Sequence, residues 1–152
     1  MIRKHLAYAW YIVRHKWYVF VECLKRGLIW RGITHDLSKL RPGEWVPYAH
    51  SFYGPQPRTE RTKARFDYAW LMHQKRNDHH WQFFVLREDS GKEKVLPMSH
   101  YARLEMLCDW IGAGKAILGK NADTAKWYRE NREVIRLHPE TRALVESELG
   151  VS

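Results

Sequence analysis

The chain has 152 residues, of which 45% are hydrophobic, and it carries a formal net charge of +9 at pH 7. This length and hydrophobic content suit one domain with a sizeable core, so we expect a single domain over residues 1–152. Two cysteines are too few for a disulfide framework, which excludes the class of small disulfide-stapled secreted domains. The basic charge favours anionic partners, either phosphorylated small molecules or nucleic acid, without choosing between them.

The N-terminal region is apolar but is interrupted by His5, Arg14, His15 and Lys16. Neither a signal-peptide core nor a membrane span of about 20 apolar residues can be drawn through it. We therefore expect a soluble, cytoplasmic protein with no membrane partner. The oligomeric state stays open, with a homo-oligomer among the alternatives.

The first predicted helix runs from about Arg3 to Arg26 and stops at Gly27. An i, i+4, i+7 pattern of apolar residues predicts one core-facing stripe. The stripe consists of Leu6, Trp10, Val13, Trp17, Phe20 and Leu24. The other side carries tyrosines, His15 and Glu22, so we expect His15 in a partly buried setting, where a hydrogen bond to Glu22 or to a tyrosine is the alternative to a ligand role.

The middle of the chain contains three further helical segments. One begins near Thr34 and surrounds the His35-Asp36 doublet, and the next begins at Pro42 with "PGEWVPYAHSFY". After a loop over residues 53–63, "TKARFDYAWLMHQKR" places Phe66, Trp70 and His73 on one helix face. Asn77 is expected to cap a new helix that begins "DHHWQFF".

The last third adds three more helices. The stretch 87–97 is a loop or a short hairpin, and Met98–Leu118 is a strong helix in which Glu105 and Asp109 lie one turn apart. Helices near 121–136 and 139–149 follow, the last with Pro139 at its start. The pattern predicts an all-α bundle of about six to seven helices.

Eight side chains could serve as metal donors, and they fall on four or five separate predicted helices. They are His15, His35, Asp36, His73, His79, His80, Glu105 and Asp109. No zinc-finger cysteine spacing exists, so a structural zinc site is disfavoured. A histidine and carboxylate set suits a catalytic divalent ion with open positions for water and substrate.

In this set the sequence resembles the HD superfamily of metal-dependent phosphohydrolases. That superfamily holds metal in a helical bundle with an early histidine, a His-Asp doublet and a later aspartate. The resemblance makes His15 the early histidine, His35 and Asp36 the doublet, and Asp109 in "EMLCDW" the late aspartate. It implies an HD-like fold for the whole chain.

The additional His73 and His79 or His80 look like the extra ligands of two-metal members of that superfamily. The resemblance therefore implies one or two divalent ions, of Mn, Fe, Co, Ni or Zn, with Mg as a further alternative. Which of His79 and His80 is a ligand stays open. "HDLSKLRP" also looks like the His-Asp-x-Gly-Lys stretch of the cyclic-dinucleotide phosphodiesterases, but Ser38 replaces the glycine and the Gly-Tyr-Pro signature is absent.

Four motifs in order look like a family of short proteins frequent in bacteriophages and prophages. They are "RHKWYVFVEC", "HDLSKLRPGEW", "HQKRNDHHW" and "EMLCDW". The likeness covers almost the whole chain and implies a fold more firmly than a reaction. For a phage-encoded protein the compartment would be the host cytoplasm.

The resemblance implies hydrolysis of a phosphoester or phosphoanhydride, with a nucleotide as the expected substrate. Asp36 would bridge two ions and orient the attacking water, and Lys39 would neutralise a phosphate oxygen. Arg14, Lys39 and Arg76 are candidates for binding phosphate, although a solvated surface role is the alternative for Arg76. Glu22 and Glu105 are expected to support ligands from behind.

Two other functional classes remain open. The charge of +9 is compatible with a nuclease or a nucleic-acid-binding protein. A few HD-fold proteins hold two irons and act as oxygenases, which the resemblance adds as a third class. Trp70 or Trp81 could stack on a base, with core packing as the alternative for each.

Overall fold

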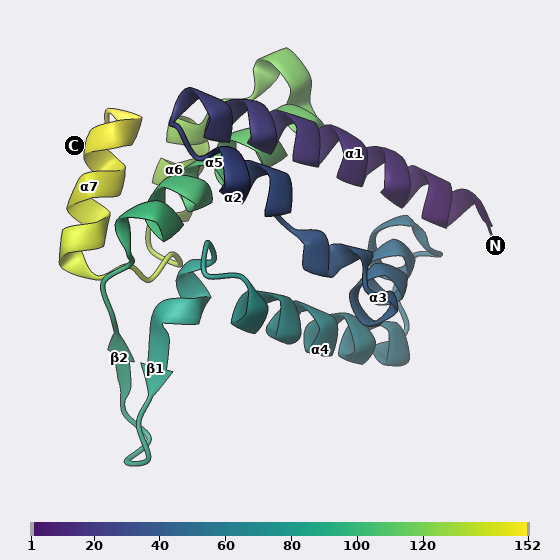
Figure 1. Ribbon diagram of the computed structural model, residues 1–152. Coiled ribbons are helices and arrows are strands. Elements are labelled where there is room, and N and C mark those ends of the chain that lie inside the picture. The colour runs from purple at the N-terminus through teal and green to yellow at the C-terminus, as the bar shows by residue number, and fades with distance from the viewer. Residues whose placement is uncertain (1, 152) are drawn as a thin grey trace.

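The computed structural model describes residues 2–151 and shows an all-α bundle with one small β-hairpin (Figure 1). The expected fold class is confirmed, and the described residues form seven α-helices. The helices are α1 Ile2–Lys25, α2 Ile29–Thr34, α3 Pro42–Tyr53, α4 Glu60–Arg76, α5 His100–Leu118, α6 Thr124–Asn131 and α7 Pro139–Leu149. Within residues 2–151, no helix has the length and apolar character that crossing a bilayer requires.

Helix α1 buries the face opposite to the one that its apolar stripe predicts. Trp10 and Trp17 of that stripe are 65% and 61% exposed, whereas Val19 on the other face is fully buried. The buried residues are Tyr8, Ile12, His15, Val19, Glu22 and Cys23. The prediction that the Leu6 to Leu24 stripe is core was therefore wrong.

The close contact between α1 and α5 explains this choice of face. Gly112 of α5 lies directly against Val19, and a Cβ built on Gly112 would fall 2.4 Å from Val19 Cγ2 and 2.9 Å from the Val19 backbone nitrogen. Such an approach of two helices requires small side chains between them. Valine and cysteine fit this contact, and the large indoles of the opposite face do not.

The His35-Asp36 doublet lies at a break between helices, whereas the sequence predicted a helix that surrounds it. Helix α2 ends at Thr34, His35 and Asp36 form a turn, and a 3₁₀ turn, Leu37–Leu40, follows. Asp36 has a left-handed backbone with φ of 56°, and it is the only non-glycine residue with positive φ in the described chain. A left-handed aspartate costs conformational energy, and such residues cluster at functional sites.

Helix α4 begins and ends at identifiable caps. Thr59 accepts a hydrogen bond from the Thr62 backbone N–H, so the helix starts at Glu60, inside the stretch expected to be a loop to residue 63. Asn77 caps the C-terminal end of α4, because its Nδ2 donates to the His73 carbonyl at 2.8 Å. The predicted new helix after Asn77 is only a turn followed by a 3₁₀ turn, Trp81–Phe84.

The later elements match the sequence more closely. The stretch 87–97 forms most of a hairpin, in which β1 Val85–Arg87 pairs with the antiparallel β2 Glu93–Val95. The hairpin projects from the helical bundle (Figure 1). Ser99 caps α5, which begins at His100 and not at the predicted Met98, and Pro139 is the first residue of α7, as predicted. The helix expected over 121–136 is shorter and ends at Asn131.

The apolar residues that pack along α1 form two separate clusters, and polar residues lie between them. Tyr8 and Ile12 pack with Tyr48, Ala49 and Ala69 from α3 and α4. About three turns further along, Val19 and Cys23 pack with Leu28 and Cys108. His15 lies between these two clusters, at the point where α1 faces the doublet and α5.

Candidate metal centre

A first group of four donor atoms converges from α1, the doublet and α5. His15 Nε2 lies 3.3 Å from Asp36 Oδ2 and 3.2 Å from Asp109 Oδ1. His35 Nε2 lies 3.4 Å from each of these two oxygens and 3.3 Å from His15 Nε2. Two imidazole nitrogens and two carboxylate oxygens therefore point at one small volume.

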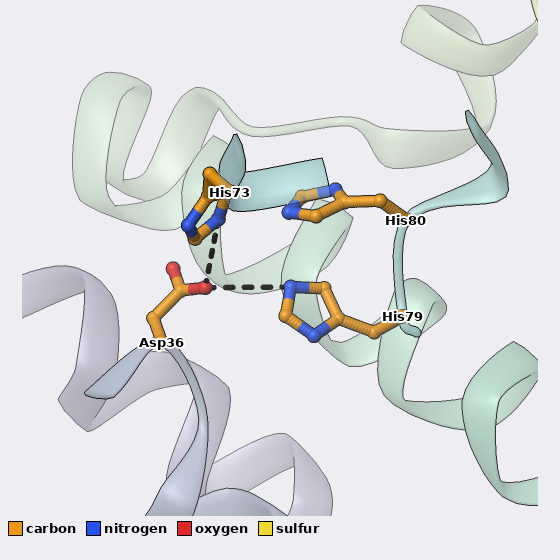
Figure 2. A group of neighbouring side chains, drawn as sticks. All are labelled: Asp36, His73, His79 and His80. Carbon is orange, nitrogen blue, oxygen red and sulfur yellow. Dashed lines mark ion pairs between the residues drawn. The ribbon is translucent and has the colours of Figure 1, made fainter. Parts of the chain in front are cut away.

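A second group of donors uses the other oxygen of Asp36 (Figure 2). Asp36 Oδ1 lies 3.2 Å from His73 Nε2 and 3.4 Å from His79 Nε2. His80 stands beside both, with its ring centroid 4.2 Å from that of His79 and 4.8 Å from that of His73. Both His79 and His80 join this group, and Asp36 contributes one oxygen to each group.

The spacing of the donor atoms suits coordination of a divalent ion better than hydrogen bonding between the donors. Four buried atoms of the second group have no hydrogen-bond partner within residues 2–151, although such atoms are costly unless satisfied. They are Asp36 Oδ1, His73 Nε2, His79 Nε2 and His80 Nε2. Ligand bonds of about 2.1 Å place neighbouring donors about 3.0–3.4 Å apart, which matches the distances of 3.2–3.4 Å in both groups. Each group could hold a metal ion.

Glu105 supports one histidine of each group, as expected of a supporting carboxylate. Its Oε1 lies 2.8 Å from His35 Nδ1 and 3.1 Å from His79 Nδ1. Arg31 pairs with the other oxygen of Glu105 and also with Asp78. Carboxylates behind histidine ligands fix the ring orientation and the tautomer, and they raise the basicity of the ligand nitrogen.

Glu44 supports His73 in the same way, although no sequence pattern indicates this role. It is 1% exposed, and its Oε2 lies 2.8 Å from His73 Nδ1. Ser38 donates to the same oxygen at 2.9 Å. In the sequence Glu44 is an acidic residue in the first turn of a helix, where the helix dipole alone accounts for it. Only the packing of α3 against α4 reveals the second role.

Two cations lie beside the doublet. Lys39 Nζ is 2.5 Å from Asp36 Oδ2, and Lys16 donates to the His35 carbonyl oxygen. Burial raises the pKa of the Asp36 carboxyl, but the charges of His35 and Lys39 outweigh burial and hold that pKa well below its usual range. Burial lowers the pKa of Lys39, and the nearby Asp36 charge more than compensates, so Lys39 stays protonated.

The paired histidines differ in their protonation. Burial and the neighbouring His79 hold the pKa of His80 well below its usual value, so His80 is neutral and able to bind a metal. Burial lowers the pKa of His79, but the adjacent carboxylates of Asp36 and Glu105 raise it to about 10. A metal ion at this position would have to displace a proton from His79, which makes binding dependent on pH.

Three predicted site residues lie elsewhere. Arg76, expected to bind phosphate, pairs with Glu44 at 2.5 Å. Glu22, expected to support a ligand, forms ion pairs with Lys25, Arg26 and Lys115. His15 Nδ1 has no partner among the described residues, so the alternative of a His15 to Glu22 hydrogen bond is not realised there. Arg14 is half-buried and lies near Tyr53.

A pocket of about 340 Å³ opens beside the donor groups. Its lining includes four tryptophans, two side-chain amides and two of the donor residues. These are Trp70, Trp81, Trp110, Trp127, Gln82, Asn131, His80 and Asp109, with Val134 and Ile135. His80 and the side chain of Asp109 are 9% and 13% exposed, whereas each of the other five donor residues is at most 2% exposed. The pocket is therefore the side from which solvent reaches the donors.

The comparisons with known proteins give the chain a family. A family model described as a family of unknown function, DUF5662, matches residues 4–151. The chain belongs to this family. Searches of curated proteins and of solved structures found no match.

Proposed function

We propose that this protein is a divalent-metal-dependent phosphohydrolase that acts on a nucleotide. The proposal depends chiefly on Asp36, which gives Oδ2 to one donor group and Oδ1 to the other. A carboxylate shared in this way is typical of centres that hold two ions about 3.5–4 Å apart. The mixture of imidazole and carboxylate donors suits Mn, Fe, Co, Ni or Zn.

The chain supplies the electrostatic setting for phosphoryl chemistry. When bound, divalent ions lower the pKa of a coordinated water and neutralise the charge of phosphate oxygens. Lys39 remains protonated beside Asp36, so it offers a point charge to a phosphate oxygen. Glu105 and Glu44 keep the histidines in one orientation, which preorganises the centre before substrate arrives.

The tryptophan-lined pocket favours a nucleotide over a simple phosphoester. Aromatic side chains in such a pocket can stack on a planar base, and each stacked base is worth about 1–3 kcal/mol. Gln82 lines the pocket and its Oε1 has no hydrogen-bond partner among the described residues, which makes it a candidate acceptor for an N–H at the edge of a base. A volume of about 340 Å³ suits one nucleotide, which favours a small-molecule substrate over a polymer.

The test is metal content and phosphate release in wild type, Asp36→Asn and Asp67→Asn. The first substitution keeps the shape of Asp36 but removes its charge, and Asp67 is an exposed aspartate on α4 that serves as the control. We expect about two ions per chain in wild type and Asp67→Asn, and less than one in Asp36→Asn. Release of phosphate from a nucleoside monophosphate should depend on added metal and be lost in Asp36→Asn.

A comparison of substrates tests the pocket separately. A nucleoside monophosphate should have a KM about tenfold below that of ribose 5-phosphate, and Trp127→Leu should remove that difference while metal content is unchanged. Full phosphatase activity in Asp36→Asn would overturn the proposal. Stoichiometric iron without phosphatase activity would point to oxygen chemistry instead, and salt-sensitive binding of nucleic acid without hydrolysis would point to a binding protein.

A further inference from the structure

The tryptophan-bearing face of α1 is an exposed apolar stripe. Its residues are each at least half exposed, although the helix that carries them is the longest in the described chain. They are Ile2, Leu6, Trp10, Val13, Trp17 and Leu24, with exposures of 50–72%. Exposed single apolar residues are ordinary, but a continuous stripe of this kind marks an interaction surface.

The spacing of the stripe is that of a helix-to-helix seam. From Leu6 to Leu24 the apolar positions, with half-buried Phe20 included, advance by alternating steps of four and three residues. This is the a and d pattern of a heptad, which buries a narrow seam against a second helix. Within residues 2–151 another helix approaches this face only at Phe20, where Gly32 of α2 lies against the ring, and the other six residues of the stripe stay at least half exposed.

The area of the stripe matches what a stable dimer needs. Six large side chains that are half or more exposed, two of them tryptophans, offer on the order of 700 Å² of surface. A standard specific interface buries about 800 Å² on each partner. The stripe alone therefore approaches the size of a complete interface.

We propose that a second copy of this chain docks on the stripe, with α1 packed against α1. A two-fold axis makes one patch serve both partners, so a single stripe of suitable area is sufficient. A bilayer surface is the less suitable occupant, because an interfacial helix turns a broad polar face to water. The reverse side of α1 instead carries His15 and is buried in the bundle. This proposal is independent of the chemistry at the metal centre.

The first test is the mass of the protein in solution, by light scattering or sedimentation equilibrium. At about 10 μM, a concentration at which typical specific complexes persist, wild type should have twice the monomer mass of 18.3 kDa. Trp17→Glu should raise the dimer dissociation constant at least about 100-fold, because interfacial tryptophans dominate binding and each substitution occurs twice. Tyr68→Glu, which replaces an aromatic residue 66% exposed on α4, is the control and should stay dimeric.

Cross-linking locates the interface directly. Val13 is the midpoint of the stripe from Ile2 to Leu24, so two Val13→Cys chains should form a disulfide for either orientation of the helices. The native cysteines are fully buried, and Tyr68→Cys is the matched control that should stay uncoupled. The proposal would be overturned if wild type were a monomer at 100 μM, or if it bound anionic lipid vesicles as a monomer. It would also be overturned if the dimer survived Trp17→Glu and Val13→Cys formed no cross-link.

Discussion

Substitution of Glu105 by glutamine should weaken metal binding at both donor groups at once. One oxygen of Glu105 contacts His35 in the first group and His79 in the second. Carboxylates behind metal ligands are typically worth 10–100-fold in affinity, or about 1.4–2.7 kcal/mol. Glutamine keeps the size of the side chain but removes the charge and turns an NH₂ group or a neutral oxygen toward Arg31. We therefore expect a loss near the upper end, of about 100-fold.

A competition titration with a chromophoric chelator, with Zn²⁺ or Mn²⁺ at pH 7.5, measures this loss. Glu22→Gln is the matched control, because Glu22 is an equally buried carboxylate that pairs with Lys115 of α5 and not with a histidine. The control should bind both ions as wild type does. If Glu105→Gln binds both ions within threefold of wild type, the carboxylate does not tune its histidines and the reasoning is refuted.

Two further predictions concern stability. Gly112→Ala should destabilise the fold by about 1–3 kcal/mol, because the new Cβ would collide with Val19. Gly114→Ala, whose Cβ would lie 3.4 Å from its nearest neighbour, should be neutral or stabilising by up to about 1 kcal/mol. Urea titration compares the two variants, and equal stability would contradict the close contact. Burial raises the pKa of Glu22, but hydrogen bonds from its lysine and arginine partners lower it from 4.5 to about 2. The charged Glu22 therefore adds on the order of 3 kcal/mol to the free energy of unfolding. This contribution is complete above pH 5 and is lost as the pH falls toward 2. The difference in unfolding free energy between wild type and Glu22→Gln should therefore shrink between pH 5 and pH 3, while Glu133→Gln, at a side chain 92% exposed, should show no difference at either pH.

The sequence predicted most of the helices because local signals mark their ends. Gly27, Pro42 and Pro139 each stand within a residue or two of the helix boundary that they predict. The donor residues were also recognisable, because histidine and carboxylate donors on several helices suit a shared centre. In the described structure seven of them form the two donor groups, and Glu105, the eighth, lies behind His35 and His79.

The sequence could not decide which face of α1 is buried. Two stripes at helical spacing run along this helix, and hydrophobicity favours the one with Trp10 and Trp17. The decision depends on Gly112, which lies far away in the sequence and allows only small residues between α1 and α5. Asn77 illustrates the same limit, because an N-cap and a C-cap residue look alike until the direction of the next segment is known.

The backbone at the doublet was equally hidden. An adjacent His-Asp pair inside a helix would direct its side chains about 100° apart. The left-handed Asp36 breaks the helix, and both side chains then reach the first donor group while Asp36 keeps its second oxygen for the other group. Aspartate tolerates this backbone better than most residues, but nothing in the sequence requires it here.

The convergence of the donor groups and the exposure of the stripe both follow from the orientation of α1 about its own axis. Val19 and Cys23 face α5 because only small side chains fit against Gly112, and this orientation places His15 between the two apolar clusters. The same orientation leaves Trp10 and Trp17 facing outward. Burial of the more hydrophobic face would remove His15 from Asp36 and Asp109. The helix therefore exposes its larger apolar surface because the donor set needs the other face, and that exposed surface is then free to bind a partner.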